Sequence, residues 1–375
     1  VANNIDGLAQ VEFNGDGENT LIVEGEIAQF AQVAFTGDGN NTLQTIEGSI
    51  AHGATVSFGN GDNTLAVGEH IASGVSISFG GGDNFVSVAG NIMSGEEFDL
   101  NTLQIEKAAG PHLSFGDGDN DVDINGAILG WAADEKRVAI EFGNGENDVR
   151  VVGYESVELA NGDEDDVSVR YATLDFGDGG NFLGVAQGVQ LSTIAFGDGD
   201  DSVAIGGNVR SSELKLGGGD DTVTVGGELH LSTIDMGDGD NKLSVGGNIG
   251  QGSKVSFGSG ADAFLLAGSD VMIRGDAQGR KSIVDMGDGD DNVTIVCSSD
   301  TDPDEMTIVR SGAFLYGGEG NDTLTVRAVD PVELIARTGK QTVTLTFDGD
   351  YKVGDVVSVT IGEGAEPITY TVQAS

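Results

Sequence analysis

A short acidic phrase rich in glycine returns through most of this chain at nearly constant spacing. At 196–201 it reads Phe-Gly-Asp-Gly-Asp-Asp, and a stretch of alternating polar and apolar residues follows it. A unit that repeats about every 20 residues predicts a stack of similar coils around one shared core. The repeat constrains the fold more strongly than any single motif.

The first glycine of each phrase marks the register of the coils. Gly197, Gly217 and Gly237 lie 20 residues apart, and the first three intervals of the chain are 22, 22 and 21 residues. The markers are Gly15, Gly37, Gly59, Gly80, Gly116, Gly143, Gly177, Gly197, Gly217, Gly237, Gly258, Gly287 and Gly318, with Gly162 as a candidate fourteenth. The longer gaps predict loops inserted at 91–111, 130–137, 269–281 and 297–306.

Each coil carries two clear strand patterns and a shorter third segment. Residues 202–205 and 213–216 alternate polar with apolar, which is typical of half-buried strands. A Gly-Gly pair at 206–207 turns the chain, and Val209 after it is expected to point inward. The sequence therefore predicts an all-β fold, a parallel β-solenoid resembling a β-roll or β-helix with about 20–22 residues per coil.

The apolar residue before the turn is usually phenylalanine. Phe58, Phe79 and Phe115 hold this slot, whereas Leu216 and Met236 fill it later in the chain. A slot repeated once per coil predicts rings stacked in the core rather than a ligand cage.

The last 45 residues depart from the repeat. Residues 341–347, 356–361 and 368–372 alternate like strands, with an Asp-Gly-Asp turn at 348–350. We expect two parts: a solenoid over 1–329, and a small antiparallel β unit over 330–375 that either caps it or forms a separate module.

Charge and composition exclude several partners. The formal net charge is −45, which argues against binding nucleic acid and against an anionic membrane surface. No apolar run reaches the length of a membrane span, and Cys297 is the only cysteine. A chain that begins at Val1 without a signal peptide is expected to be a mature form, a fragment, or a protein exported by another route.

The stacked acidic turns predict a cation. Carboxylates repeated about 5 Å apart would repel one another by about 3 kcal/mol per pair at an effective dielectric near 20, an upper estimate. Calcium prefers carboxylate and carbonyl oxygens, and both are present in the turn. The expected metal ligands are Asp117, Asp119, Asp198, Asp200, Asp201, Asp220, Asp221, Asp238, Asp240, Asn241, Asp262, Asp288, Asp290, Asp291 and Asp322.

The turn resembles the calcium-binding nonapeptide Gly-Gly-x-Gly-x-Asp-x-apolar-x of the repeats-in-toxin family. Residues 317–325 match it most fully, and 197–204, 217–224 and 287–294 match from the second glycine onward. The resemblance covers about residues 11–327 and implies an extracellular protein that folds on calcium. It places the family's ligand aspartate on Asp201, Asp221, Asp262, Asp291 and Asp322.

This chain departs from that family in three ways. It has one acidic turn per coil, so metal is expected along one edge only. The first glycine is usually replaced by phenylalanine or another apolar residue. The ligand position is asparagine in many coils, and asparagine either ligates through its amide oxygen or forms a ladder without metal. We therefore expect tighter sites at 198–291 and at Asp322.

The sequence favours a structural role over catalysis. Its four histidines lie in different coils, and no catalytic signature is present. We expect a secreted, calcium-stabilised protein of the bacterial cell surface: a surface layer, a filament subunit or an adhesin stalk. Expected partners are further copies of the chain, surface polysaccharide or other surface proteins. The alternatives are a polysaccharide lyase or epimerase on a β-helix, and an ice-binding solenoid, whose threonine row is broken here.

Overall fold

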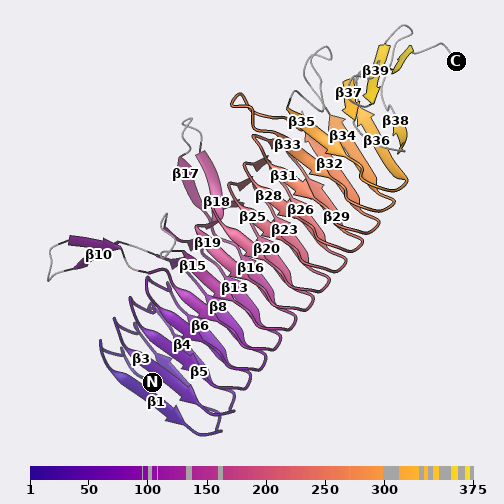
Figure 1. The fold of residues 1–375 in the computed structure, drawn as a ribbon. Helices are drawn as coiled ribbons and strands as arrows, with labels where there is room; N and C mark the ends of the chain where they lie inside the picture. Colours follow the sequence, from indigo (N-terminus) through magenta and orange to yellow (C-terminus); the bar gives the residue numbers. More distant parts are fainter. Residues whose placement is uncertain are drawn as a thin grey trace. The chain divides into compact units, whose positions relative to one another are not determined.

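The computed structural model describes residues 1–94, 96–99, 104–107, 109–131, 137–158, 164–269, 271–298, 312–328, 333–336, 341–345, 356–361 and 368–371. Every regular element in these ranges is a β-strand. The chain divides into two compact units, unit 1 (Val1–Ala204) and unit 2 (Ile205–Ser375). The coils of each unit stack in sequence order as a parallel β-solenoid, which confirms the predicted fold class (Figure 1).

Each coil passes through three parallel sheets in a fixed order. A strand of sheet 1 leads into the acidic turn, and a strand of sheet 2 follows that turn. A second turn then leads to the short segment of sheet 3, as the sequence predicted after the Gly-Gly pair.

Unit 1 contains eight strands of sheet 1, eight of sheet 2 and four of sheet 3. In sheet 1 they are β1 (Gln10–Asn14), β3 (Gln32–Thr36), β5 (Thr55–Phe58), β7 (Ser76–Ser78), β12 (His112–Ser114), β15 (Val138–Glu141), β19 (Ala172–Asp175) and β22 (Thr193–Ala195). In sheet 2 they are β2 (Thr20–Val23), β4 (Thr42–Thr45), β6 (Thr64–Val67), β8 (Phe85–Val88), β13 (Asp121–Ile124), β16 (Asp148–Val151), β20 (Phe182–Val185) and β23 (Ser202–Ile205), which ends at the unit boundary. In sheet 3 they are β9 (Ile92–Met93), β14 (Ile128–Leu129), β18 (Glu164–Arg170) and β21 (Gly188–Gln190).

Unit 2 follows the same plan. Its sheet 1 holds β25 (Glu213–Lys215), β28 (Thr233–Asp235), β31 (Lys254–Ser256), β33 (Ser282–Asp285) and β35 (Ala313–Tyr316). Its sheet 2 holds β26 (Thr222–Val225), β29 (Lys242–Val245), β32 (Ala263–Ser269), β34 (Asn292–Ser298), β36 (Asp322–Ala328) and β38 (Gln341–Leu345). Its sheet 3 holds β24 (Val209–Arg210), β27 (Leu229–His230) and β30 (Ile249–Gly250).

Equivalent residues of successive coils face one another, so each core position forms a column. In sheet 2, for example, Leu21 pairs with Leu43, and Leu43 pairs with Leu65. In sheet 3, Ile27 pairs with Ile50 through a single bridge. These side chains are almost fully buried. Burying one such side chain contributes about 1.5–3 kcal/mol, so the columns supply much of the stability.

The phenylalanine slot forms one continuous stack in unit 1, as predicted. Its seven successive ring pairs run from Phe13 to Phe196, with centroids 4.4–5.1 Å apart and nearly parallel planes. In unit 2 the corresponding residues include Leu216, Met236 and Met286, all buried. Aromatic stacking adds about 0.5–1.5 kcal/mol per pair beyond burial, so this contribution is concentrated in unit 1.

The corner between sheets 3 and 1 holds a residue with left-handed backbone in many coils. Among the described residues other than glycine, those with positive φ are Leu8, Phe30, Tyr171, Leu191, Ser211, Leu231 and Gln251. Left-handed backbone costs a residue with a Cβ about 1–2 kcal/mol. Glycine avoids this strain and occupies the same corner at Gly53 and Gly74.

The substitution Ser211→Gly is accordingly expected to raise the free energy of unfolding by up to about 1 kcal/mol. Ser211 is exposed and has φ 50°, so glycine relieves strain there without removing core contacts. The control Ser244→Gly, within strand β29, is expected to lower stability by about 0.5–1 kcal/mol. Urea denaturation followed by circular dichroism measures both changes. Destabilisation by Ser211→Gly would contradict the argument from strain.

Two antiparallel hairpins interrupt the coils of unit 1. One joins β10 (Glu96–Asp99) to β11 (Gln104–Lys107), within the loop predicted at 91–111. The other joins β17 (Glu155–Glu158) to β18 and was not predicted. Gly162, the candidate fourteenth coil marker, lies between these strands in the sequence and outside the described residues. The acidic sequence around Gly162 resembles that of a coil turn. Of the loop predicted at 297–306, residues 299–306 also lie outside the described ranges.

The C-terminal strands are partly antiparallel. β39 (Val356–Ile361) and β40 (Ile368–Thr371) pair antiparallel, as expected. β38 instead pairs in parallel with β36, and β37 (Glu333–Ala336) pairs in parallel with β39. One of the three strands expected in the end unit therefore extends sheet 2 of the solenoid.

Candidate metal site at the acidic turns

The acidic turn of each coil contributes three residues to three parallel rows. The first outer row is the residue between the two glycines, the second outer row is the residue after the second glycine, and the inner row is the residue after that. The backbone register within each unit brings equivalent turn residues of successive coils next to one another.

The residues predicted to bind metal are divided among these rows. The first outer row contains Asp117, Asp198, Asp238 and Asp288. The second outer row contains Asp119, Asp200, Asp220, Asp240 and Asp290. The inner row contains Asp201, Asp221, Asn241, Asp262, Asp291 and Asp322, and all six of these side chains are buried.

Carboxylates of the outer rows accept hydrogen bonds from the next coil. The backbone N–H of Ser259 donates to Oδ1 of Asp238 at 2.9 Å, and the N–H of Ala261 donates to Oδ1 of Asp240 at 2.8 Å. The bonds from Ser259 lower the pKa of Asp238 below its usual value. This ladder stabilises the ionised form of the outer carboxylates, an arrangement that sequence analysis missed.

Neutral residues also interrupt the outer rows. Gly218 and Ser259 break the first row in unit 2, and Ala261 breaks the second. Both outer rows are largely exposed to solvent. The outer-row carboxylates are exposed to solvent, accept hydrogen bonds and are separated in places by neutral residues. Each of these features reduces the repulsion between carboxylates that the sequence alone suggested.

Asparagine fills the inner row through most of unit 1 and satisfies its own hydrogen bonds. Nδ2 of Asn120 donates to the carbonyl of Gly118 at 2.8 Å and to Oδ1 of Asn147 at 2.7 Å. Oδ1 of Asn120 accepts from Nδ2 of Asn84 at 2.9 Å. The residues of this asparagine row are Asn19, Asn41, Asn63, Asn84, Asn120, Asn147 and Asn181. A ladder of amide hydrogen bonds, one of the two roles considered for asparagine, is the geometry found here.

At two inner-row positions, Asp262 and Asp291, aspartate leaves one oxygen without a donor. The N–H of Asn241 donates to Oδ1 of Asp262 at 2.8 Å, and the N–H of Asp262 donates to Oδ1 of Asp291 at 2.9 Å. Among the described residues, neither Oδ2 atom has a hydrogen-bond partner. The two residues are only 1% and 2% exposed. A buried carboxylate oxygen without a donor is costly, so these positions call for a proton or a cation.

Burial also changes the proton affinity of this row. Desolvation raises the pKa of Asp201, Asp262 and Asp291 to about 6, against the opposing effect of the N–H donors. At neutral pH each of these carboxyls is therefore predominantly ionised inside the protein.

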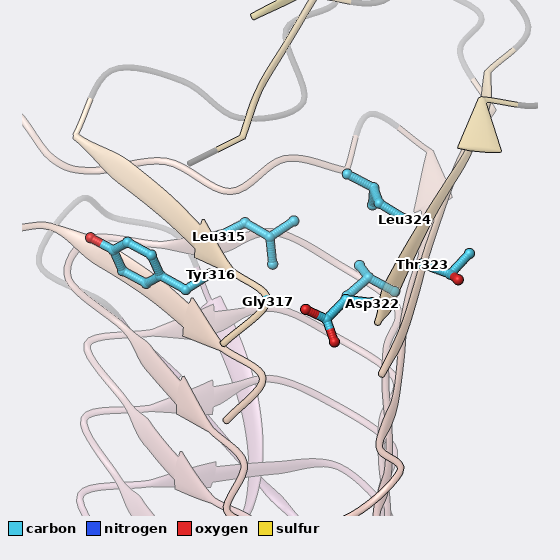
Figure 2. A pocket seen from close by; sticks show the side chains of 7 residues that line it. Leu315, Tyr316, Gly317, Asp322, Thr323 and Leu324 are labelled. Atoms are coloured by element: carbon cyan, nitrogen blue, oxygen red, sulfur yellow. The ribbon is translucent and has the colours of Figure 1, made fainter. Parts of the chain in front are cut away.

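A small cavity lies beside the inner-row carboxylate of Asp322. Figure 2 shows this carboxylate projecting toward Gly317 between the two strands. Gly317 follows β35 at the place where Met286 follows β33, so a large core side chain is missing there. The cavity measures about 20 Å³, enough for one water-sized guest.

The inner row fits a calcium ion better than the outer rows do. In the described part of the chain, no three side chains of His, Cys, Asp or Glu converge on one point. A cation must therefore also use backbone oxygens. Nδ2 of Asn241 shows where they lie, because it donates to the carbonyls of Gly237 and Gly239, both at 3.1 Å. Because Asp262 and Asp291 follow glycines at the same spacing as Asn241, we infer that their Oδ2 atoms lie near equivalent glycine carbonyls. Such an oxygen set suits calcium.

A row of buried serines was not predicted. In unit 2 the N–H of Ser212 donates to Oγ of Ser232 at 3.3 Å, and the N–H of Ser232 donates to Oγ of Ser253 at 3.2 Å. The recurrence of serine two residues before the apolar centre of four of the five sheet 1 strands of unit 2 was the available signal. These hydroxyls satisfy buried backbone groups at the corner.

Other candidate groups are dispersed or paired. His112 contacts Glu141 at 3.4 Å, and Nδ1 of His70 accepts the N–H of Asn91. In the inserted loop at 271–281, Arg280 forms an ion pair with Asp276. A groove of about 320 Å³ crosses the outer face of β26, β29, β32 and β34, and Lys242 is the only charged residue lining it.

Comparison with protein-family models, with curated proteins and with solved structures yields no match. The fold and the site therefore define the class, an all-β parallel solenoid with an acidic edge, and the resemblance to the repeats-in-toxin family depends on the turn motif alone. None of the residues described here forms a helix able to cross a membrane.

Proposed function

We propose that this chain is a calcium-stabilised structural protein of the extracellular space or the bacterial cell surface. One observation carries the proposal: a ladder that satisfies itself with asparagine contains aspartates whose buried Oδ2 atoms lack a donor, at Asp262 and Asp291. A calcium ion bound there would supply the missing positive charge. The chain's own residues supply the carboxylate and glycine carbonyl oxygens, and they exclude water by burial.

The proposed extracellular location is based on where calcium is abundant enough to occupy such sites. Calcium-binding modules with Kd values of about 10⁻⁴–10⁻³ M are suited to extracellular conditions. A net charge of −45 disfavours compact folding without counterions and is compatible with calcium-rich surroundings. Folding after export, when calcium first becomes available, is the expected sequence of events.

Calcium is expected to raise the melting temperature of the protein. At a concentration 100 times Kd, one site bound only by the folded state adds about 2.7 kcal/mol to its stability. Magnesium should stabilise less, because it requires shorter, octahedral coordination and retains its waters. Thermal denaturation followed by circular dichroism in calcium chloride, magnesium chloride or chelator tests this. A melting temperature unaffected by calcium would refute the proposed role of the ion.

The proposed structural role is assembly of this chain into a surface layer, a filament or an adhesin stalk. Stacked coils form a continuous structural element without requiring a catalytic centre. Electron microscopy of the protein with calcium distinguishes sheets or filaments from single particles. Exclusively single particles over a wide concentration range would argue against self-assembly.

The groove over β26, β29, β32 and β34 supports one alternative, the binding or cleavage of a polysaccharide. A lyase or epimerase needs a base close to carboxylates in its substrate groove. Formation of unsaturated ends on alginate or pectate would show lyase activity. Such activity would replace the structural proposal.

A further inference from the structure

We propose that calcium dependence is confined to unit 2, where calcium binds the inner row at Asp262 and Asp291, and that the asparagine coils of unit 1 fold without it. The inference rests on the proposed function, because it assigns the site and the reach of the same ion. Under this proposal unit 1 folds with or without calcium, whereas the folding of unit 2 depends on calcium.

The asparagine row needs no ion because, from Asn41 to Asn181, Nδ2 of each side chain donates a hydrogen bond and Oδ1 accepts one. Asn147 is typical: its Nδ2 donates to Oδ1 of Asn181 at 2.9 Å and to the carbonyl of Gly145 at 3.1 Å. Its Oδ1 accepts from Nδ2 of Asn120 at 2.7 Å. A cation at this place would meet an N–H group, which it cannot use as a ligand.

The aspartate row of unit 2 presents oxygen where the asparagine row presents N–H. Asp262 and Asp291 follow one another in the ladder, with the N–H of Asp262 on Oδ1 of Asp291. Their Oδ2 atoms are buried without a partner and, by the repeat, face glycine carbonyls. Oxygen facing oxygen at a buried position is unfavourable until a positive charge enters. Asp322 ends this run and borders a cavity of about 20 Å³.

The core supports the same division independently. All seven stacked pairs of the phenylalanine column lie in unit 1. In unit 2, Phe257 makes a tilted contact with Phe264 at 6.5 Å, and the last slot is Gly317. Unit 1 therefore has two continuous ladders, amide and aromatic, that need no ligand. Only its last inner-row residue, Asp201, is acidic among the inner-row residues at 19–201.

Hydrogen exchange of the full chain, read by mass spectrometry, tests the division. The protein is compared free of calcium and in calcium chloride at about 100 times Kd. Peptides covering β32 and β34 are expected to gain about 100-fold protection on adding calcium. Peptides covering β4, β6 and β13 are expected to change less than about twofold.

Two matched double variants are expected to change calcium dependence in opposite directions. Asp262→Asn with Asp291→Asn converts the row to the amide type, so β32 and β34 should be protected without calcium and should lose their response to it. Asn120→Asp with Asn147→Asp creates adjacent carboxylates in unit 1, so β13 and β16 should become dependent on calcium. If this second variant unfolds without calcium, its recovery on adding calcium is the same expected result.

The outcomes separate this inference from the proposed function. Equal calcium protection of both units would overturn the confinement and leave the calcium-stabilised function standing. Absence of any calcium effect would overturn both. An unchanged calcium response of β32 and β34 in the Asp262→Asn, Asp291→Asn variant would overturn the assignment of the inner row.

Discussion

In calcium-free protein, stability is expected to fall steeply as the pH rises from 4 to 7. The carboxyls of Asp201, Asp262 and Asp291 have a folded pKa of about 6, because burial disfavours their charge, against a usual value of 3.8. Each such shift corresponds to about 3 kcal/mol. Urea denaturation at several pH values measures the change.

The direction of this change in stability with pH follows from proton binding. These carboxyls have a higher pKa when folded than when unfolded, so between pH 4 and 6 the folded state holds more protons. Their contribution to stability is complete below the unfolded pKa, near pH 4, and is lost as the pH passes 6. Ordinary acid denaturation, which depends on carboxylates with a lowered pKa, has the opposite direction.

The variant Asp262→Asn with Asp291→Asn is the control for this prediction. It keeps the exposed carboxylates, whose mutual repulsion also relaxes at low pH. The difference between its pH profile and that of the unaltered protein isolates the two buried groups, and we expect about 3 kcal/mol for each. Superimposable profiles would contradict the buried, ionised state of Asp262 and Asp291.

The substitution Phe115→Ala is expected to lower the free energy of unfolding by about 4–5 kcal/mol. The Phe115 ring is buried and stacks on Phe79 and Phe142, each with centroids 4.7 Å apart. Truncation loses the transfer of the ring from water, leaves a cavity, and breaks two stacked pairs. Urea denaturation, with hydrogen exchange of β12 as a local readout, measures the loss.

Two controls distinguish stacking from burial. Phe115→Leu keeps most of the apolar volume and should cost about 1–2 kcal/mol, because leucine fills the same slot at Leu216. Phe257→Ala removes a buried ring outside the stack and should cost about 3 kcal/mol. A loss at Phe115 no greater than that at Phe257 would show that ring stacking adds nothing to burial.

Much of the fold could be predicted from the repeat. The alternation of polar and apolar residues predicted which faces of the strands are buried, and the slot before the turn predicted the stack of rings. Val209 after the Gly-Gly pair predicted the strand of sheet 3 in its coil. The hairpin of β17 and β18 was not predicted because the sequence between these strands contains the same glycine and acidic residues as a coil turn. The residue types alone do not distinguish a coil turn, which joins strands of two different sheets, from a hairpin turn, which joins two strands of the same sheet.

The division of the acidic edge into rows could have been predicted and was not. Val203 and Ile205 point inward, so extending the same period of two backward places Asp201 inward and Asp200 outward. The prediction of a single charged edge does not make this distinction. The backbone hydrogen bonds of the outer rows could not have been foreseen, because they depend on the spacing and direction of N–H groups in the next coil.

The asparagine row also has a polarity. Every amide points its Nδ2 toward the next coil and its Oδ1 toward the preceding one, from Asn19 to Asn181, where Nδ2 donates to Oδ1 of Asp201 at 3.0 Å. Aligned side-chain dipoles add along such a row, as peptide dipoles add along a helix. The electropositive end lies at Asp201, the one place along the asparagine row where negative charge replaces an amide. The order of amide and acid along the chain therefore matches the direction of the field inside it.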